Sequence, residues 1–327
     1  MSGNRVAWAA WLPTFARVRF AALLLAGVCG CGEQEKTMLF HAGVGQRSSL
    51  DEIKELFCQR HPDVKVNFSY KGSGYFIADI TRSQEGDLYM PGEEFYLLQA
   101  VERGFITDYQ PDRDIAAYFV TVIITPRGNP KGIQKVEDFA KPGVRVGLGN
   151  PKACAIGLWH EKTFKRAGIW ETVQENAAFS AKCIPELGNA AQHNLIDATI
   201  VWATTAVLYL RDVETIPLEP KYRGIVRLPV AVLKFARHPK EAQLLKDLIL
   251  SDEGKEIFLG HAYAVGNIPR DGDGFEADEG QATEKLMTWL VNAARALKEE
   301  SFVADAASVG PLIKEVNRQR KTTRAGN

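Results

Sequence analysis

The order of apolar and polar residues follows two different periods along most of the chain. Alternation with a period of two predicts a strand at 64–68, and an apolar stripe at helical spacing predicts a helix at 49–60. The same reasoning predicts strands at 37–41 and 87–90 and helices at 76–82 and 94–103. Strands that alternate with helices are typical of βαβ units, so we expect a largely parallel sheet.

A second set of elements follows a β-branched run at 119–124. This run predicts a strand that is buried on both faces and long enough to cross between two lobes. Strands and helices alternate again up to residue 210, and the stretch 225–233 is the expected return crossing. Helices at 239–250 and 252–259 then complete the first lobe. The expected fold class is therefore α/β, with two lobes, two crossing strands and a helical C-terminal extension.

The N-terminal residues have the pattern of an export signal. Arg17 and Arg19 precede an apolar segment that is too short to span a bilayer of about 30 Å. The segment ends in Val28-Cys29-Gly30-Cys31, which resembles the bacterial lipobox, where the last cysteine is lipidated after cleavage before it. We therefore expect an exported protein that is lipid-anchored through Cys31 and faces the periplasm or the cell exterior. An ordinary signal peptide cut nearby is the alternative.

These patterns divide the chain into five parts. They are a lipoprotein signal peptide (1–30), a linker (31–36), a first lobe (37–119 and 230–269), a second lobe (120–229), and a C-terminal helical extension with a basic tail (270–327).

Composition narrows the classes of function. The chain is 46% hydrophobic and 24% charged, which is ordinary for a soluble globular protein. It has 40 basic and 40 acidic residues, and loss of Arg5, Arg17 and Arg19 with the signal leaves 37 basic residues against 40 acidic ones. A nearly neutral protein exerts no long-range attraction on nucleic acid, so no nucleic-acid partner is expected. The remaining cysteines have no zinc-ligand spacing, and we expect no metal and no cofactor.

Several strands end in a short polar or glycine-containing loop, after which a helix begins. A helix N-terminus presents unpaired N–H groups and about half a positive charge. Several such termini directed at one cleft bind an anion without lysine or arginine. The relevant helix starts lie at Ser48-Ser49, Gly72-Ser73-Gly74, Cys154-Ala155-Ile156 and Cys183-Ile184. Ser49 also has a purely structural interpretation, because Ser49 and Glu52 have the spacing of a capping box.

The order of these segments resembles the molybdate-binding proteins of bacterial ABC importers, from about Met38 to Val265. The matching segments include Leu39-Phe40-His41-Ala42-Gly43, Ser49-Leu50, Phe68-Ser69-Tyr70-Lys71-Gly72-Ser73-Gly74, Pro126-Arg127-Gly128-Asn129-Pro130, Val144-Arg145-Val146-Gly147, Thr199-Ile200-Val201-Trp202 and Leu228-Pro229-Val230-Ala231-Val232. The resemblance implies a two-lobed, type II periplasmic-binding-protein-like fold. It also implies a substrate-binding protein, expected to be a monomer, that captures molybdate or tungstate for an importer permease and is not an enzyme.

The resemblance also implies which residues bind the oxyanion. Members of that family hold it with two serines, two backbone N–H groups and a tyrosine hydroxyl. The corresponding positions here are Ser49, with Ser48 as the alternative register, Ser73, the backbone near Ile156 and Ile184, and Trp202 in place of the tyrosine.

This chain departs from the family pattern at three further points. Four extra residues in the first loop bring Arg47 near the cleft, where a guanidinium can bind an anion bidentately. Glu186 lies just inside a ligand-facing helix start, where it would repel an anion unless it is turned away. Cys154 and Cys183 lie beside ligand loops; our hypothesis is that a disulfide joins them, and two free thiols are the alternative.

Three alternatives remain open at this point. In the first alternative, the ligand is a different anion, either a sulfate-like anion or a small organic anion held by Arg47. In the second alternative, the protein is a sensor that uses the same fold and takes no part in transport. The third is an enzyme in which Cys154 and His160 act as nucleophile and base, although His160 is only six residues further along the chain.

Overall fold

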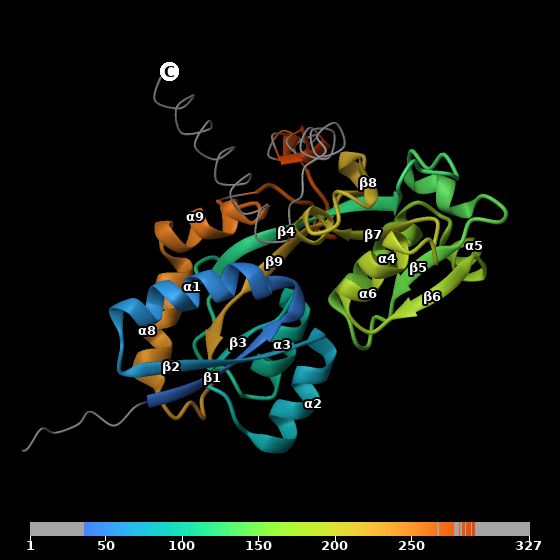
Figure 1. Ribbon diagram of the computed structural model, residues 1–327. Helices are drawn as coiled ribbons and strands as arrows, with labels where there is room; N and C mark the ends of the chain where they lie inside the picture. Colours follow the sequence, from blue (N-terminus) through green and yellow to red (C-terminus); the bar gives the residue numbers. More distant parts are fainter. Residues whose placement is uncertain are drawn as a thin grey trace, which may run out of the picture. The chain divides into compact units, whose positions relative to one another are not determined.

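The computed structural model describes residues 36–291, except residues 267, 278–280, 282, 285 and 289 (Figure 1). The predicted signal peptide, the proposed lipidation site at Cys31 and the basic tail lie outside the described residues. Among the described residues, no helix combines the length and the apolar character needed to cross a membrane.

The first lobe is built on a four-stranded sheet with the order β10-β3-β1-β2. Strand β1 pairs in parallel with both β2 and β3, and β10 pairs antiparallel with β3. The predicted parallel arrangement is therefore confirmed for the three strands that come first in the chain. Their bounds are β1 Lys36–Gly43, β2 Val64–Lys71 and β3 Leu88–Met90, with β10 at Ala231–Val232.

Helices cover both faces of this sheet (Figure 1). On β3, Leu88 and Met90 belong to one apolar cluster, and Tyr89 belongs to the other, because successive side chains of a strand point to opposite faces. Helices α1, α8 and α9 contact one another, as do α2 and α3. The bounds are α1 Arg47–Arg60, α2 Ser73–Ser83, α3 Glu94–Glu102, α8 Pro239–Leu250 and α9 Asp252–Gly260.

The long strand β4 (Ile115–Pro126) links the two lobes. Residues 115–120 pair antiparallel with β9 (Ile225–Pro229), whereas residues 121–126 pair antiparallel with β7 and β8. β4 and β9 are the two predicted crossing strands. In this second sheet β4 has antiparallel neighbours along its length. In the described part of the second lobe, β5 and β6 pair in parallel, and an isolated parallel bridge joins Val146 to Ala198.

The second lobe also contains elements that periodicity did not reveal. Strand β8 (Val213–Pro217) and helix α5 (Trp170–Glu175) are short and carry no clear apolar period. Among the described residues, short 3₁₀ helices occupy connections of this lobe at Val136–Ala140 and Pro220–Tyr222, and another at Val44–Gln46 precedes α1 in the first lobe. The other elements are β5 Val146–Gly149, α4 Ala155–Arg166, β6 Ala177–Ala181, α6 Ile184–Gln192, β7 Thr199–Trp202 and α7 Ala203–Val207.

The segment 268–277 is attached to the protein by a buried ion pair and an aromatic contact. An Arg223 guanidinium nitrogen lies 2.7 Å from a Glu276 oxygen, and both side chains are almost fully buried. The Phe275 ring meets Trp159 edge-on at a centroid distance of 5.4 Å. The start of the C-terminal extension is therefore part of the folded protein.

Candidate functional site

Ser73 is the first residue of α2, and its buried side chain faces the loop after β3. Its Oγ accepts a hydrogen bond of 2.9 Å from the Gly92 backbone N–H. Among the described residues, the proton of this hydroxyl has no acceptor within hydrogen-bond distance. The Ser73 hydroxyl is therefore able to donate a hydrogen bond to an additional group.

Ser49 lies inside α1, since the helix begins two residues earlier than predicted, at Arg47. Its Oγ is fully buried, donates to the Gln46 carbonyl at 3.0 Å and lies 3.3 Å from the Tyr263 hydroxyl. The predicted capping box is wrong, because Ser49 is in the first turn of the helix rather than at its cap. The helix is capped by Gln46, which makes no side-chain capping bond.

The buried Gln46 side chain fixes the loop that precedes α1. Its Oε1 accepts from the Gly43 N–H at 3.1 Å, and its Nε2 donates to the Pro91 carbonyl at 2.9 Å. Gln46 thereby connects the ends of β1 and β3. The sequence pattern did not single out this residue.

Arg47 and Ser48 are both exposed. The Arg47 guanidinium lies over the Tyr70 ring, 4.4 Å from its centroid. This cation–π contact holds the side chain against the end of β2, just before Gly72 and Ser73.

Trp202 ends β7 and is buried against Phe119 of β4. The two rings are stacked with a centroid distance of 4.8 Å and an interplanar angle of 2°. Phe119 also stacks with Tyr263 at a centroid distance of 5.2 Å, and the Tyr263 hydroxyl donates to the Gly45 carbonyl at 3.0 Å. A stack of three rings therefore connects the second lobe with the loop before α1.

Phe119 lies where the predicted ligand positions meet. A Cβ on Gly45 would lie 3.4 Å from Phe119 Cζ, 3.5 Å from Trp202 Cδ1 and 3.7 Å from Ile184 Cγ2. A Cβ on Gly92 would lie 3.2 Å from Ser73 Oγ, 3.4 Å from Ala155 Cβ and 3.9 Å from Phe119 Cε2. The structure thus brings Ser73, Trp202 and the first residues of α4 and α6 around one ring. From the sequence we expected Phe119 to be ordinary core, because nothing in the run 119–124 marks one position as central.

The two lobes are in direct backbone contact next to this site. A Cβ on Gly72 would lie 2.2 Å from the Ala153 carbonyl oxygen, and one on Gly74 would lie 1.9 Å from the Lys152 carbonyl oxygen. The Tyr96 hydroxyl, from the first lobe, donates to the Pro151 carbonyl at 2.7 Å. The lobes are therefore closed on each other.

Cys154 and Cys183 are the N-cap residues of α4 and α6. Both are free thiols, so the predicted disulfide between them is absent. Burial raises the pKa of Cys154 to about 12, although the N–H groups of Ile156 and Gly157 oppose the shift. Burial and the neighbouring Glu186 also raise the pKa of Cys183. Neither thiol makes a capping hydrogen bond to its own helix, and the Cys183 thiol lies 3.4 Å from a Glu186 carboxylate oxygen.

Glu186 is turned back toward the loop before α6. Its carboxylate accepts from the Lys182 N–H at 2.8 Å and from Cys183 Sγ at 3.4 Å. These two contacts hold the negative charge of Glu186 next to the loop before α6.

A second acidic residue near the site is protonated more readily than usual. Burial raises the pKa of Glu93 to about 7. The hydrogen bond of 2.8 Å that its carboxylate accepts from the Phe95 N–H lowers the pKa and only partly offsets this effect. Glu93 directly follows Gly92 in the loop that binds Ser73. In its protonated form it adds no negative charge beside the site.

His160 does not form a catalytic pair with Cys154. Its Nδ1 accepts from the Gly149 N–H at 2.9 Å, and its Nε2 lies 2.7 Å from the Ile200 carbonyl. Burial lowers its pKa to about 4. Both ring nitrogens are therefore used to connect α4 with β5 and β7. In the part of the chain that the structure describes, no three His, Cys, Asp or Glu side chains are grouped to bind a metal ion.

Comparison with known proteins shows which family the chain resembles. Residues 40–263 match the family described as bacterial extracellular solute-binding protein. The chain is 22% identical to the molybdate-binding protein ModA of Mycobacterium tuberculosis, over 75% of this chain and 95% of the relative.

Two solved structures share the fold. The sulfate-binding protein SubI of Mycobacterium tuberculosis has a TM-score of 0.62 at 14% identity and covers 79% of this chain and 91% of its own. The periplasmic molybdate-binding protein of Azotobacter vinelandii has a TM-score of 0.61 at 14% identity and covers 70% of this chain and 100% of its own. The predicted resemblance and the two-lobed fold class are confirmed.

Proposed function

Because the chain belongs to the bacterial extracellular solute-binding protein family, we propose that it captures molybdate or tungstate between its lobes for the permease of an ABC importer. The observation that carries this proposal is the meeting of Ser73 with the helix starts at Ala155 and Ile184 around Phe119. In the proposed site the donors are neutral hydroxyl and N–H groups. In this role the protein performs no chemistry on its ligand.

The proposed oxyanion accepts hydrogen bonds from Ser73 Oγ, from the backbone N–H groups near Ile156 and Ile184, and from the Trp202 indole. Ser49, buried beside Tyr263, keeps the loop before α1 in place and is the second serine of the proposed set. A hydrogen bond to a charged group contributes about 1.5–3 kcal/mol. About five such bonds offset the desolvation of a small dianion and leave about −8 kcal/mol, which corresponds to micromolar affinity.

Closure of the lobes supports this proposal. Gly72 and Gly74 are in backbone contact with the second lobe, so a bound ion is shielded from water by both lobes. A shielded site strengthens each hydrogen bond to the anion, because the local dielectric constant is lower than that of water.

The proposed tether is a lipid on Cys31, which keeps the protein next to its transporter. The sequence around Cys31 is the basis for this part of the proposal. Intact-mass measurement of the membrane-extracted protein tests it. Acylated protein that begins at Cys31 is expected, and a soluble mature form without a lipid contradicts it.

One observation favours a second ligand class, namely sulfate or a small organic anion. Trp202 stands in the place of the tyrosine, and an indole offers one N–H in a direction different from that of a phenol. Arg47, held over Tyr70, lies next to the loop where a carboxylate or phosphate of a larger ligand could be bound bidentately.

Isothermal titration calorimetry of the purified protein with molybdate, tungstate, sulfate and phosphate tests the proposal. Saturable binding of molybdate or tungstate at micromolar concentration or below is expected, with weaker binding of the other two. Preference for sulfate supports the second class, and no heat with molybdate and tungstate contradicts the first.

A further inference from the structure

Residues 270–276 form a tight hairpin that follows the residues matching the family, which end at 263. Its first and last residues form an antiparallel bridge, and the Asp271 N–H donates to the Phe275 carbonyl at 2.8 Å. The Asp271 carboxylate closes the turn, because it accepts from the N–H groups of Asp273 and Phe275 at 3.0 Å each. The conformation of this hairpin is therefore fixed by its own hydrogen bonds.

The hairpin is held against α4 of the second lobe. A nitrogen of Arg166, near the end of α4, lies 2.7 Å from an Asp271 oxygen. The Phe275 ring contacts both the Arg166 guanidinium, 4.4 Å from the ring centroid, and the Trp159 ring. Since α4 begins at Ala155 in the proposed anion site, the hairpin packs on a helix that forms part of that site.

The hairpin is also held at the start of the crossing strand β9. The Ile225 N–H donates to the Gly274 carbonyl at 2.9 Å, and the Glu276 N–H donates to the Arg223 carbonyl at 3.0 Å. The side chains of Arg223 and Glu276 form the buried ion pair described above. With these contacts to β9 and α4, we expect the hairpin to move together with the second lobe.

The hairpin reaches the first lobe through Arg270. A nitrogen of its guanidinium lies 3.4 Å from a Glu94 oxygen, and the two side chains are 27% and 13% exposed. Glu94 is the first residue of α3 and lies two residues after Gly92, whose N–H donates to Ser73. The consecutive residues Arg270 and Asp271 thus pair with helices of opposite lobes, each of which begins beside the proposed site.

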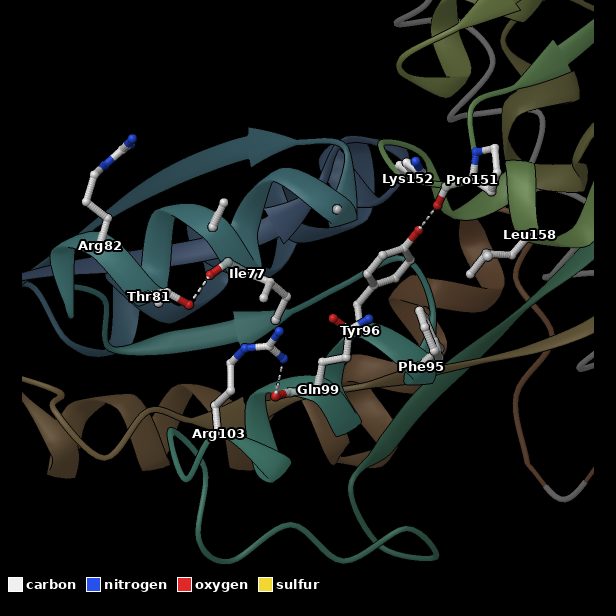
Figure 2. Close-up of a pocket in the computed structure, with 12 residues that line it drawn as sticks. Ile77, Thr81, Arg82, Phe95, Tyr96, Gln99, Arg103, Pro151, Lys152 and Leu158 are labelled. Carbon is white, nitrogen blue, oxygen red and sulfur yellow. Dashed lines mark hydrogen bonds between the residues drawn. The ribbon is translucent and has the colours of Figure 1, made fainter.

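The start of α3 also contacts the second lobe directly. Figure 2 shows the Tyr96 ring with its hydroxyl directed at Pro151 of the second lobe, beside the pocket that this ring lines. The hydrogen bond between them is 2.7 Å long. Movement of the lobes apart lengthens this bond and the contact of Arg270 with Glu94 together, whereas the contacts of the hairpin with α4 and β9 stay within one body. The contact of Arg270 with Glu94 therefore belongs to the closed protein.

Glu94 keeps other partners when this contact is lost. Its Oε1 accepts from the Tyr109 hydroxyl at 2.6 Å and from an Arg227 nitrogen at 3.3 Å, whereas its Oε2 faces Arg270. Loss of Arg270 thus leaves no carboxylate without a partner. A partly exposed ion pair of this kind changes an equilibrium by up to about fivefold. The contact is therefore strong enough to affect opening of the lobes and weak enough to be broken in each cycle.

From this geometry we propose that the hairpin 270–276 is a latch, which moves with the second lobe and pairs Arg270 with Glu94 on closure, so that release of the bound anion is slowed. The inference rests on the proposed function. The anion leaves after the lobes open, so a contact that belongs to the closed protein lowers the rate of release and leaves the rate of capture almost unchanged.

Four variants and one double variant test the latch. Arg270→Gln removes the cation, and Arg270→Lys keeps it. Arg237→Gln is the matched control, because Arg237 pairs with Glu85 at 2.7 Å and both residues lie in the first lobe. Glu94→Gln, alone and together with Arg270→Gln, completes a double-mutant cycle that isolates the contribution of the pair. None of these residues belongs to the proposed ligand site.

Two measurements are made on each full-length protein. The first is the affinity for molybdate by calorimetry, and the second is the rate at which radiolabelled molybdate is released during a chase with excess unlabelled molybdate. For Arg270→Gln we expect release to be about two- to fivefold faster and affinity to fall by the same factor. Arg270→Lys and Arg237→Gln should match wild type. In the Glu94→Gln background, Arg270→Gln should have no further effect. Added sodium chloride should reduce the difference between wild type and Arg270→Gln, because salt screens a partly exposed pair.

The outcomes separate this inference from the function on which it rests. Release by Arg270→Gln at the wild-type rate overturns the latch and leaves the proposed function intact, because molybdate binding is measured independently. An equal acceleration by Arg237→Gln, or by Arg270→Gln in the Glu94→Gln background, also overturns the latch, because the effect would then not depend on the contact between the lobes. Absence of molybdate binding by wild type overturns the proposed function, and with it this inference.

Discussion

Substitution Gly74→Ala places one methyl group between the two lobes. Gly74 is the second residue of α2, and its Cβ would lie 1.9 Å from the Lys152 carbonyl oxygen and 3.2 Å from Ala153 Cα. Both neighbours are backbone of the opposite lobe, so no side-chain rotation relieves the overlap. The substitution therefore opposes closure without removing any group that binds the ligand.

The size of the effect follows from these distances. A carbon–oxygen contact needs about 3 Å or more, so the second lobe must retreat by about 1 Å. The hydrogen bond between Tyr96 and Pro151 then exceeds hydrogen-bonding distance, which costs about 1 kcal/mol. At least one hydrogen bond from the second lobe to the proposed anion is weakened as well, at about 1.5–3 kcal/mol. The total of about 2–4 kcal/mol corresponds to an affinity about 30- to 1000-fold lower.

Calorimetry with molybdate, together with thermal unfolding of the unliganded protein, checks this prediction. Gly272→Ala is the matched control, because a Cβ at that position meets no atom within 4 Å. The melting temperature of Gly74→Ala without ligand should equal or exceed that of wild type, since alanine is favoured over glycine in a helix by up to about 1 kcal/mol. Small-angle scattering of each variant with ligand reports whether the lobes close.

Two results would refute the reasoning. The first is wild-type affinity in Gly74→Ala, because the overlap would then be relieved without opening the lobes. The second is a large loss of unliganded stability in this variant alone, because the lobes would then be closed in the absence of ligand.

Three other substitutions have distinct expected effects. Ser73→Ala removes the acceptor for the buried Gly92 N–H and also one proposed donor to the ligand. We expect the unfolding free energy to fall by about 1–3 kcal/mol and the affinity for molybdate to fall about tenfold or more. Unchanged affinity would exclude Ser73 as a ligand group. The folded-state pKa of Glu93, about 7, exceeds its ordinary value of 4.5, so the native state binds more protons than the unfolded state and stability falls as the pH rises through this window. In urea titrations, Glu93→Gln should therefore raise the unfolding free energy by about 3 kcal/mol at pH 8 and leave it unchanged at pH 4. A gain that does not depend on pH would contradict this cause. Arg223→Met leaves the Glu276 carboxylate buried without its ion-pair partner, so we expect the unfolding free energy in the same titrations to fall by about 3–5 kcal/mol. A fall below about 1 kcal/mol would show that the pair contributes little.

The sequence predicted those parts of the fold that local periodicity determines. The strand at 64–68 and the helix at 49–60 have strong apolar patterns, and β2 and α1 contain them. The crossing at 119–124 was predicted because a run of β-branched residues requires burial on both faces. Element ends were less accurate, since α1 is started by Gln46 and the preceding 3₁₀ turn rather than by Ser49.

The arrangement of side chains in the site could be predicted only in part. Family resemblance indicated Ser73 and Trp202, and the structure brings both of them close to Phe119. The central role of Phe119 and its contact with Tyr263 depend on pairing between segments about 144 residues apart, which no local pattern encodes. The disulfide prediction failed for a similar reason. Sequence adjacency to ligand loops does not determine whether Cys154 and Cys183 bind each other or, as observed, remain free thiols at the N-caps of two separate helices.

The most direct test of the central claim is a crystal structure of the protein with tungstate, located by its anomalous scattering. The account predicts one strong anomalous peak between the closed lobes, with oxygens within about 3 Å of Ser73 Oγ and of the backbone nitrogens near Ile156 and Ile184. An anion bound elsewhere, or lobes closed with no anion at this position under saturating tungstate, would contradict it.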